Sequence, residues 1–196
     1  AEARSVGDRT GETLVENEFV GMYRKAGMEE DALAHGEKAL LMLESSGLED
    51  TVTAGTTRIN VATACTAFGQ PERARMLFQE AEAIYEARLE PTDGRLGGLY
   101  NNMGLCMISL KRFEEGRMLF EKALEVMRRV PNGEGEAAMT CLNLADLISA
   151  EAEEAGDEET LIRAAEETER LVERAWELLN TPTLPRDGYD RFICDK

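Results

Sequence analysis

The cysteines and histidines of this sequence are few and scattered. Four cysteines, Cys65, Cys106, Cys141 and Cys194, are far apart and match neither a CxxC metal motif nor a disulfide framework. The first three fall on apolar faces of expected helices, where a free thiol behaves as a small hydrophobe. We therefore predict reduced core cysteines in a cytoplasmic protein.

The acidic and basic groups give no catalytic or metal motif either. An acidic cluster, 151–159, lacks the alternating ligands and the central Gly of a calcium loop, which indicates a solvated helical turn. His35, the only histidine, has no expected acidic or thiol partners, so a structural or surface role is favoured. No phosphate loop, nucleophile elbow or HExxH pattern occurs. We expect no metal, no cofactor and no enzymatic activity.

A set of asparagines offers a different chemistry, that of hydrogen-bonded recognition. Asn60, Asn102 and Asn143 recur at intervals of 42 and 41 residues, and Asn101 adjoins the second of them. An amide side chain both donates and accepts, so it can pair with a peptide N–H and C=O. The alternative is that each asparagine bonds a neighbouring helix and fixes its packing. The spacing alone leaves both interpretations open.

The stretch 97–130 shows which elements must carry these residues. Tyr100, Met103 and Met107 recur at helical steps, as do Gly116 and Phe120 after a turn at 110–112. The pattern repeats 42 residues earlier, and a repeat at one fixed interval predicts a helical repeat protein. Small and aromatic positions carry the match: Ala62, Ala74, Phe78 and Ala81 precede Gly104, Gly116, Phe120 and Ala123 by that interval.

We expect a single repeat domain, 1–180, of about four helical hairpins: 12–46, 51–89, 94–130 and 136–179. Roughly ten residues inserted around 151–159 should lengthen both helices of the fourth hairpin. Ala1–Gly7 resembles the end of a helix, which suggests a piece cut from a longer protein. The segment 181–196 contains Pro182 and Pro185 and is expected to be an irregular cap or a truncated continuation.

Composition narrows the function. A formal net charge of −17 disfavours nucleic-acid binding, which needs basic surfaces. No apolar run is long enough for a membrane span. Charge is concentrated on the expected outer helices, whereas the inner helices are nearly uncharged; their exposed positions are polar, as in a recognition groove. The nine methionines, including Met103, Met107 and Met118, are expected to fill the core.

The small–aromatic–small pattern resembles the tetratricopeptide repeat family, over about residues 12–178. The 42-residue interval and the motifs Asn60-Val61-Ala62 and Asn102-Met103-Gly104 are similar to the kinesin-light-chain subclass and its many bacterial forms. The resemblance implies an all-α, right-handed α-solenoid of helix-turn-helix repeats. The sequence departs from the family in lacking the usual Trp, because Arg58, Tyr100 and Cys141 occupy that position.

In that subclass, asparagines at this helix position line a concave groove and bind the backbone of an extended peptide. The resemblance therefore implies a non-catalytic scaffold for a peptide or protein segment. It assigns backbone contacts to Asn60, Asn102 and Asn143, with Asn101, Thr63 and Arg58 as weaker candidates; the first repeat has Glu18 there. Two alternatives stay open: a sensor of a small signalling peptide that controls a missing effector domain, and a module that dimerises by end-to-end stacking.

Overall fold

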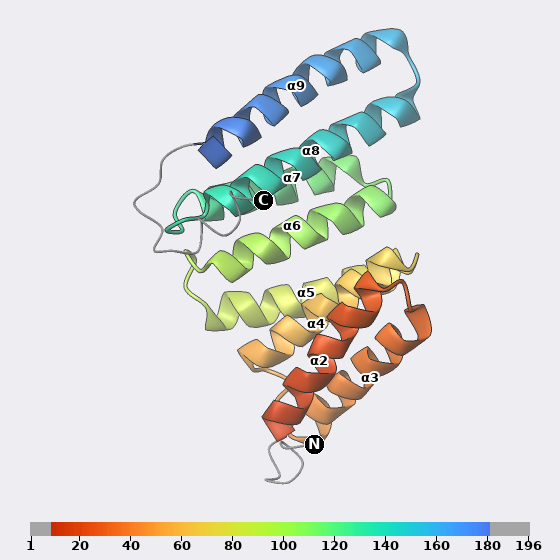
Figure 1. Cartoon of the computed structure of the whole chain (residues 1–196), viewed down its shortest axis with the longest axis vertical. Helices are drawn as coiled ribbons and strands as arrows, with labels where there is room; N and C mark the ends of the chain where they lie inside the picture. The colour runs from red at the N-terminus through yellow and green to blue at the C-terminus, as the bar shows by residue number, and fades with distance from the viewer. Residues whose placement is uncertain (1–8, 181–196) are drawn as a thin grey trace.

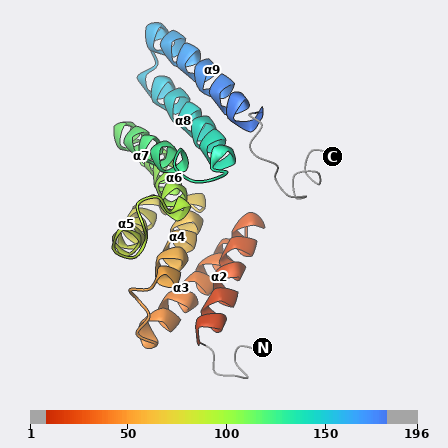
Figure 2. The same ribbon diagram turned by 90° about the vertical axis from the view of Figure 1, so that its left-hand side faces the viewer.

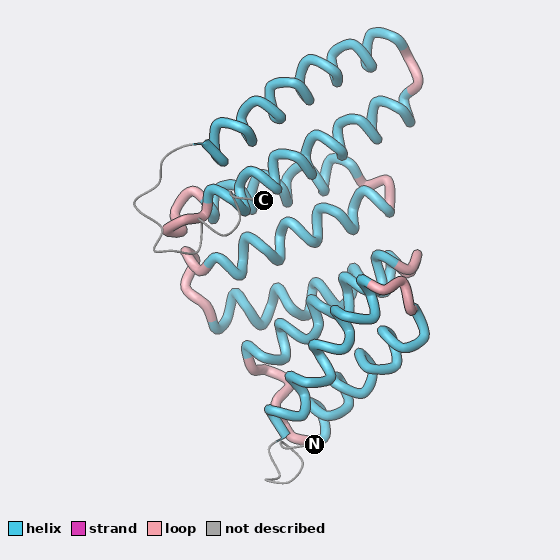
Figure 3. The backbone as a smooth tube through the Cα atoms, in the orientation of Figure 1, coloured by secondary structure: helices cyan, strands magenta, loops and turns pink. Residues whose placement is uncertain are grey.

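The protein is all-helical over the part that the computed structural model describes, residues 9–180. The expectations for Ala1–Gly7, for Cys194 and for 181–196 lie outside the described residues. Figures 1 and 3 show helices joined by short loops and no strand between residues 9 and 180. The predicted all-α repeat fold is confirmed. The helices are α2 (Arg9–Lys25), α3 (Glu29–Ser45), α4 (Val52–Ala67), α5 (Pro71–Arg88), α6 (Gly94–Ser109), α7 (Phe113–Met127), α8 (Glu134–Ala155) and α9 (Glu158–Asn180).

Local sequence signals start and stop these helices. Thr51 caps α4 by accepting a hydrogen bond from the Ala54 N–H at 3.2 Å, and Asp93 caps α6 through the Arg95 N–H at 3.0 Å. Pro71 occupies the first turn of α5, where its missing N–H costs nothing. Gly27 and Gly69 close the first two hairpins with φ of 71° and 72°, a left-handed conformation that glycine adopts readily.

The helices pair as antiparallel hairpins, and the hairpins stack into a curved array (Figures 1 and 2). The inner helices α2, α4, α6 and α8 contact one another in succession. The outer helices α3, α5, α7 and α9 stand further apart and reach one another through long side chains, as in Arg73–Glu37, Lys122–Glu82 and Arg117–Glu167. Because one layer is tight and the other spread, the stack arcs with α2, α4 and α6 along its inner side (Figure 2).

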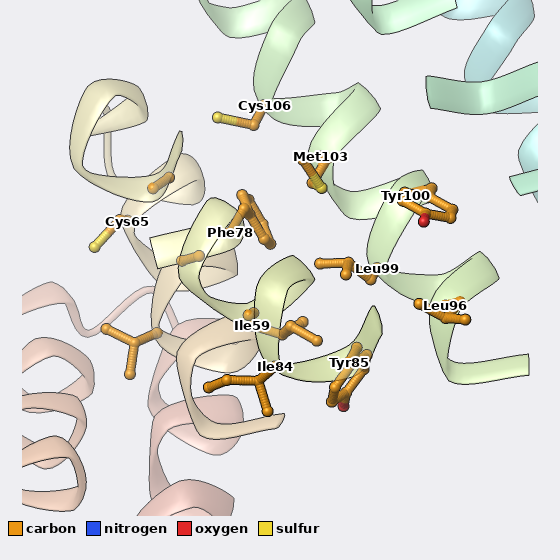
Figure 4. Packing of buried hydrophobic residues seen from close by; sticks show 14 of the residues in the cluster. Ile59, Cys65, Phe78, Ile84, Tyr85, Leu96, Leu99, Tyr100, Met103 and Cys106 are labelled. Atoms are coloured by element: carbon orange, nitrogen blue, oxygen red, sulfur yellow. The ribbon is translucent and has the colours of Figure 1, made fainter. Parts of the chain in front are cut away.

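Small residues facing aromatic rings hold each hairpin together. Phe120 of α7 is fully buried against Gly104 of α6: a Cβ at Gly104 would lie 2.6 Å from the ring. Gly55 of α4 is covered in the same way by Tyr85 of α5. Between hairpins, Phe78 and Tyr85 of α5 lie across from Leu99 and Met103 of α6 (Figure 4). The core is therefore continuous between the second and third hairpins.

The methionine prediction is only partly correct. Met103 and Met107 are buried in the core between the second and third hairpins. Met118 is 61% exposed on α7, so the expectation that it fills the core is wrong. Helical spacing places Met118 nearly opposite the core position Phe120, because two residues turn a helix by about 200°.

The fourth hairpin is longer than the others, as the expected insertion requires. Its helices α8 and α9 have 22 and 23 residues, against 16 and 15 in α6 and α7, and Gly156 closes the turn with φ of 71°. The extra turns carry two of the carboxylates of the acidic cluster. Glu151 pairs with Arg117 and Glu154 with Lys111, at 3.4 and 2.6 Å. These carboxylates tie α8 to the preceding hairpin.

Replacing each of two glycines of α6 by alanine should change the free energy of unfolding in opposite directions. Gly104→Ala should lower the free energy of unfolding by about 1–3 kcal/mol, because the buried Phe120 ring occupies the space of the new methyl group. Gly98→Ala should raise it by about 0.5–1 kcal/mol, since a Cβ there meets no atom within 4 Å and alanine favours the helix. Urea unfolding followed by circular dichroism measures both. Equal effects of the two substitutions would contradict the packing described.

The backbone conformation of Lys111, at the turn of the third hairpin, indicates a substitution that should stabilise the protein. It stands 42 residues after Gly69 and takes the same left-handed conformation, φ 56°, with a side chain that disfavours it. Lys111→Gly should therefore raise the free energy of unfolding by about 1 kcal/mol. Lys111→Ala is the control, because it removes the exposed ion pair to Glu154 but keeps the strain. An equal gain for the alanine variant would contradict this account.

Candidate functional site

The inner helices present one set of side chains that the core leaves uncovered. On α4 these are Thr56, Asn60 and Thr63, spaced by four and three residues and half-buried. Asn60 precedes the fully buried Ala62 by two residues, so the two side chains leave the helix on nearly opposite sides. We call the equivalent positions of all four inner helices the inner stripe: Leu14, Glu18, Gly21, Thr56, Asn60, Thr63, Gly98, Asn102, Leu105, Met139, Asn143 and Asp146.

Asn60 and Asn102 lie at the middle of the inner stripe, one on α4 and one on α6. Both side chains are half-buried, and neither amide makes a hydrogen bond to any other described residue. Each therefore offers a donor and an acceptor that no other described residue satisfies. The residues beside Asn102 in the inner stripe leave room for a ligand. Gly98 lies one turn from Asn102, and nothing occupies the space that a side chain at Gly98 would fill.

Asn143 is placed differently from the other two asparagines. Its Nδ2 donates a hydrogen bond to Oδ1 of Asn101 at 2.9 Å, so the pair joins α8 to α6 across a repeat boundary. For Asn143, the structure therefore supports the second interpretation of the asparagine spacing, in which the side chain bonds a neighbouring helix. The pair keeps recognition capacity, because the Asn143 Oδ1 and the Asn101 Nδ2 are not used in it.

The two remaining candidates already have partners. The Thr63 hydroxyl donates to the Ile59 carbonyl at 2.7 Å within α4, which leaves its oxygen lone pairs as acceptors. Arg58 does not join the stripe. Its Nε donates to Glu80 of the outer helix α5 at 2.8 Å, and an Nη donates to the Glu49 carbonyl at 3.2 Å. The structure thus brings Asn101 and Asn143 together and directs Arg58 towards the outer layer.

A charged cluster in the first hairpin was not predicted. Glu16 of α2 is buried and receives Nζ of Lys38 and Nδ1 of His35, both from α3 and both at 2.6 Å. Burial raises the pKa of Glu16, but the hydrogen bonds from Lys38 and His35 outweigh it and lower the pKa below its ordinary value. The His35 ring also stacks on Tyr23, with centroids 5.2 Å apart. His35 is therefore structural. The sequence feature that could have predicted this pair is Glu16, a charged residue on the core-facing side of α2.

The described thiols are placed for packing. Cys65, Cys106 and Cys141 are free and buried, as predicted. Burial raises the pKa of the Cys65 thiol to about 11 and raises those of Cys106 and Cys141, which suppresses the nucleophilic thiolate. Within residues 9–180, no three His, Cys, Asp or Glu side chains converge to hold a metal ion. None of the helices in that range is both long and apolar enough to cross a bilayer.

A cleft of about 250 Å³ opens on the other side of the array, between α5 and α7. Met103 and Met107 of α6 contribute to its lining, and Arg75, Glu82 and Lys122 stand among its polar residues. Burial raises the pKa of Glu82 even though Lys122 lies nearby. The cleft follows from the spread of the outer helices. Lys122 and Glu82 of the cleft pair with each other, whereas the amides of Asn60 and Asn102 bond no other described residue.

Comparisons with known proteins agree with this architecture. The sequence profile described as "Tetratricopeptide repeat" matches residues 12–87 and 95–155. Among solved structures, BtubC (BKLC) from P. vanneervenii is similar with a TM-score of 0.68 and 22% identity, over 90% of this chain and 68% of that one. A kinesin-light-chain-type protein of Podosopora anserina with nearly identical TPR-like repeats gives 0.65 and 15%, over 84% and 93%. A single-substitution variant of that Podosopora protein gives 0.64 and 16%, over 84% and 90%. No curated protein matches significantly.

The contrast between Asn101 and Asn60 gives a stability test. Asn101→Ala should lower the free energy of unfolding by about 1 kcal/mol, because it removes the bond that Asn143 makes across the repeat boundary. Asn60→Ala should change it little, since no described residue bonds that amide. Chemical denaturation of the two variants measures the difference. If Asn60→Ala is as destabilising as Asn101→Ala, the amide of Asn60 serves repeat stacking.

Proposed function

The chain belongs to the tetratricopeptide repeat family, whose repeats mediate protein–protein interaction, and we propose that it is a non-catalytic scaffold that binds an extended peptide segment. The ligand would lie along the inner stripe, across α4, α6 and α8. Asn60 and Asn102 would hold its backbone, with the Asn101–Asn143 pair and Thr63 extending the contact. We assign Arg58 no direct contact, because its guanidinium is already held by Glu80 and the Glu49 carbonyl.

The observation that carries this proposal is the pair of unpartnered amides in repeat register. Polar groups that are half-buried and lack partners cost free energy unless water or a ligand satisfies them. Asn60 and Asn102 are 42 residues apart and occupy the same position of successive inner helices. One amide per repeat suits an extended peptide, because its backbone offers N–H and C=O groups at regular intervals.

The surroundings of the amides favour a backbone ligand over a compact one. Gly98 leaves open space beside Asn102, so a peptide main chain could approach α6 closely. Leu105 and Met139 offer apolar contacts on either side of the asparagine row. Glu18 and Asp146 place exposed carboxylates on α2 and α8. The ligand that fits best is an extended segment with apolar side chains and a basic residue near one end.

Charge and thiol chemistry suggest where the protein works. A net charge of −17 opposes binding to phosphate backbones and to anionic lipid surfaces, so we propose a protein partner and neither nucleic acid nor membrane. The buried thiols Cys65, Cys106 and Cys141 are unpaired. Unpaired thiols are typical of reducing compartments, and we therefore propose a cytoplasmic location.

The proposal is tested by selecting binders from a random linear-peptide library on the intact chain and measuring their affinity by calorimetry. Asn60→Ala combined with Asn102→Ala should weaken binding by roughly tenfold to a hundredfold, for two lost hydrogen bonds of about 1 kcal/mol each. Gly98→Gln should also abolish binding, because a side chain would take the space beside Asn102 that the peptide needs; a Cβ at Gly98 meets no atom within 4 Å.

Gln79→Ala is the matched control, since it removes an exposed amide from the outer helix α5. It should leave the affinity unchanged. Selected peptides that bind the double variant and Gly98→Gln as tightly as the unaltered chain would contradict the proposal, as would failure to select any peptide. Circular dichroism confirms that each variant is folded.

A further inference from the structure

The first inner helix exposes apolar residues at positions that are buried in every later inner helix. Val15 and Met22 of α2 are 45% and 50% exposed. The residues 42 positions after Val15 and Met22, Thr57 and Ala64 of α4, are both 0% exposed. The equivalent pairs of α6 and α8 are at most 2% exposed: Leu99 and Cys106, and Thr140 and Leu147. Val15 and Met22 therefore belong to a face that is built for packing.

The preceding outer helix is what covers this face in the later repeats. Val61 of α4 packs on Gly36 of α3, where a Cβ would lie 3.0 Å from the Val61 side chain. The Cys106 thiol donates to the Pro71 carbonyl at the start of α5, at 3.3 Å. Leu147 of α8 lies against α7 in the same way. The end face of α2, Val15 and Met22, is thus one half of a repeat boundary, and no outer helix of the described residues packs on it.

Helix α9 forms the opposite end of the described array (Figure 1). This outer helix packs on α8 through Ala164 and Ala175, while further apolar residues stay exposed on another side of it. We call these residues the end face of α9: Leu161, Val172, Trp176 and Leu179, 43–69% exposed and separated by 11, 4 and 3 residues, which keeps them on one side of the helix. The earlier outer helices α5 and α7 each contact the inner helix that follows them, α6 and α8.

We propose that the end face of α9 of one copy packs on the end face of α2 of a second copy, so that chains associate head to tail. The contact repeats an interface that the chain already makes three times within itself, at α3–α4, α5–α6 and α7–α8. Because the two faces differ, the interface is heterologous and does not close on itself, so copies add in open series. Repeat arrays stay separate when their terminal repeats have polar outer faces, and these two ends are apolar.

Association by this route leaves the inner stripe free. The stripe lies on a different side of α2 from Val15 and Met22, and stacked copies would extend it from one chain into the next. Like charges oppose the contact, since each copy carries a net −17. Raising the ionic strength should therefore strengthen the association until the repulsion is screened.

The end faces are tested by mixing two variants that each lack one of them. Met22→Glu removes the α2 face and keeps that of α9; Trp176→Glu does the reverse. Both residues are at least half exposed, so neither substitution disturbs the core. In light scattering after size-exclusion chromatography, the unaltered chain should grow in mass with concentration. Each variant alone should stay a monomer, and their mixture should reach the mass of two chains and no more.

Fluorescence gives a second readout, because Trp176 is the only tryptophan. In the mixture, only the Met22→Glu chain carries it, and its emission should shift to the blue as the Trp176→Glu chain is added. Met118→Glu is the matched control, an equally exposed methionine on α7, and should associate like the unaltered chain.

Three outcomes would overturn the proposal. An unaltered chain that stays monomeric at all concentrations and ionic strengths would show that the end faces do not join copies. Association of the Met22→Glu chain alone would show that α9 pairs with α9. Association of the Trp176→Glu chain alone would show that α2 pairs with α2.

Discussion

The packing of a bulky side chain into the space left by a small residue determines the shape of the second and third hairpins. Phe120 fills the space over Gly104, and Tyr85 fills that over Gly55. Protein interiors are close-packed, so such a contact fixes both the distance between two helices and their rotation. Met127 covers Gly97 of α6 in the same way, and both residues stand 42 positions after Tyr85 and Gly55. Because this contact recurs at the repeat interval, α4 and α6 turn the same side away from their partners. The alignment of Asn60 with Asn102 depends on this constraint.

The same repeated contact explains both surfaces of functional interest. The side of each inner helix that faces away from the outer layer collects the amides of the inner stripe and the open space at Gly98. Thr56 lies at the edge of this side, because its hydroxyl is hydrogen-bonded to that of Tyr85 on α5 at 2.7 Å. The sides that face along the array bury Val61, Met103 and Leu144 against the preceding repeat. At the two ends of the described array the pattern meets no further described helix, and Met22 and Trp176 are exposed. A repeat architecture thus produces a lateral recognition surface and two end faces from one packing rule.

Much of the fold could be predicted from the sequence because its signals are local and repeated. The helical period, the cap at Thr51 and the turn at Gly69 each depend on neighbouring residues. The hydrogen-bond state of the asparagines could not be predicted, since it depends on a side chain 42 residues away: Asn143 meets Asn101, whereas Asn60 precedes Asn102 by the same interval and bonds no described residue. Arg58 lies only two residues from Asn60, yet its pairing with Glu80 sets it apart from the inner stripe.

The central claim is that the side-chain amides of Asn60 and Asn102 are free to bind a ligand backbone. Nuclear magnetic resonance of the asparagine side-chain NH₂ groups tests it most directly, with a library-selected peptide as the titrant. The account predicts that the NH₂ signals of Asn60 and Asn102 shift and become protected from solvent exchange as the peptide saturates. It also predicts that the Gln79 signal on the outer helix α5 stays unchanged. Shifts confined to residues of α5 and α7 that line the outer cleft would contradict the account.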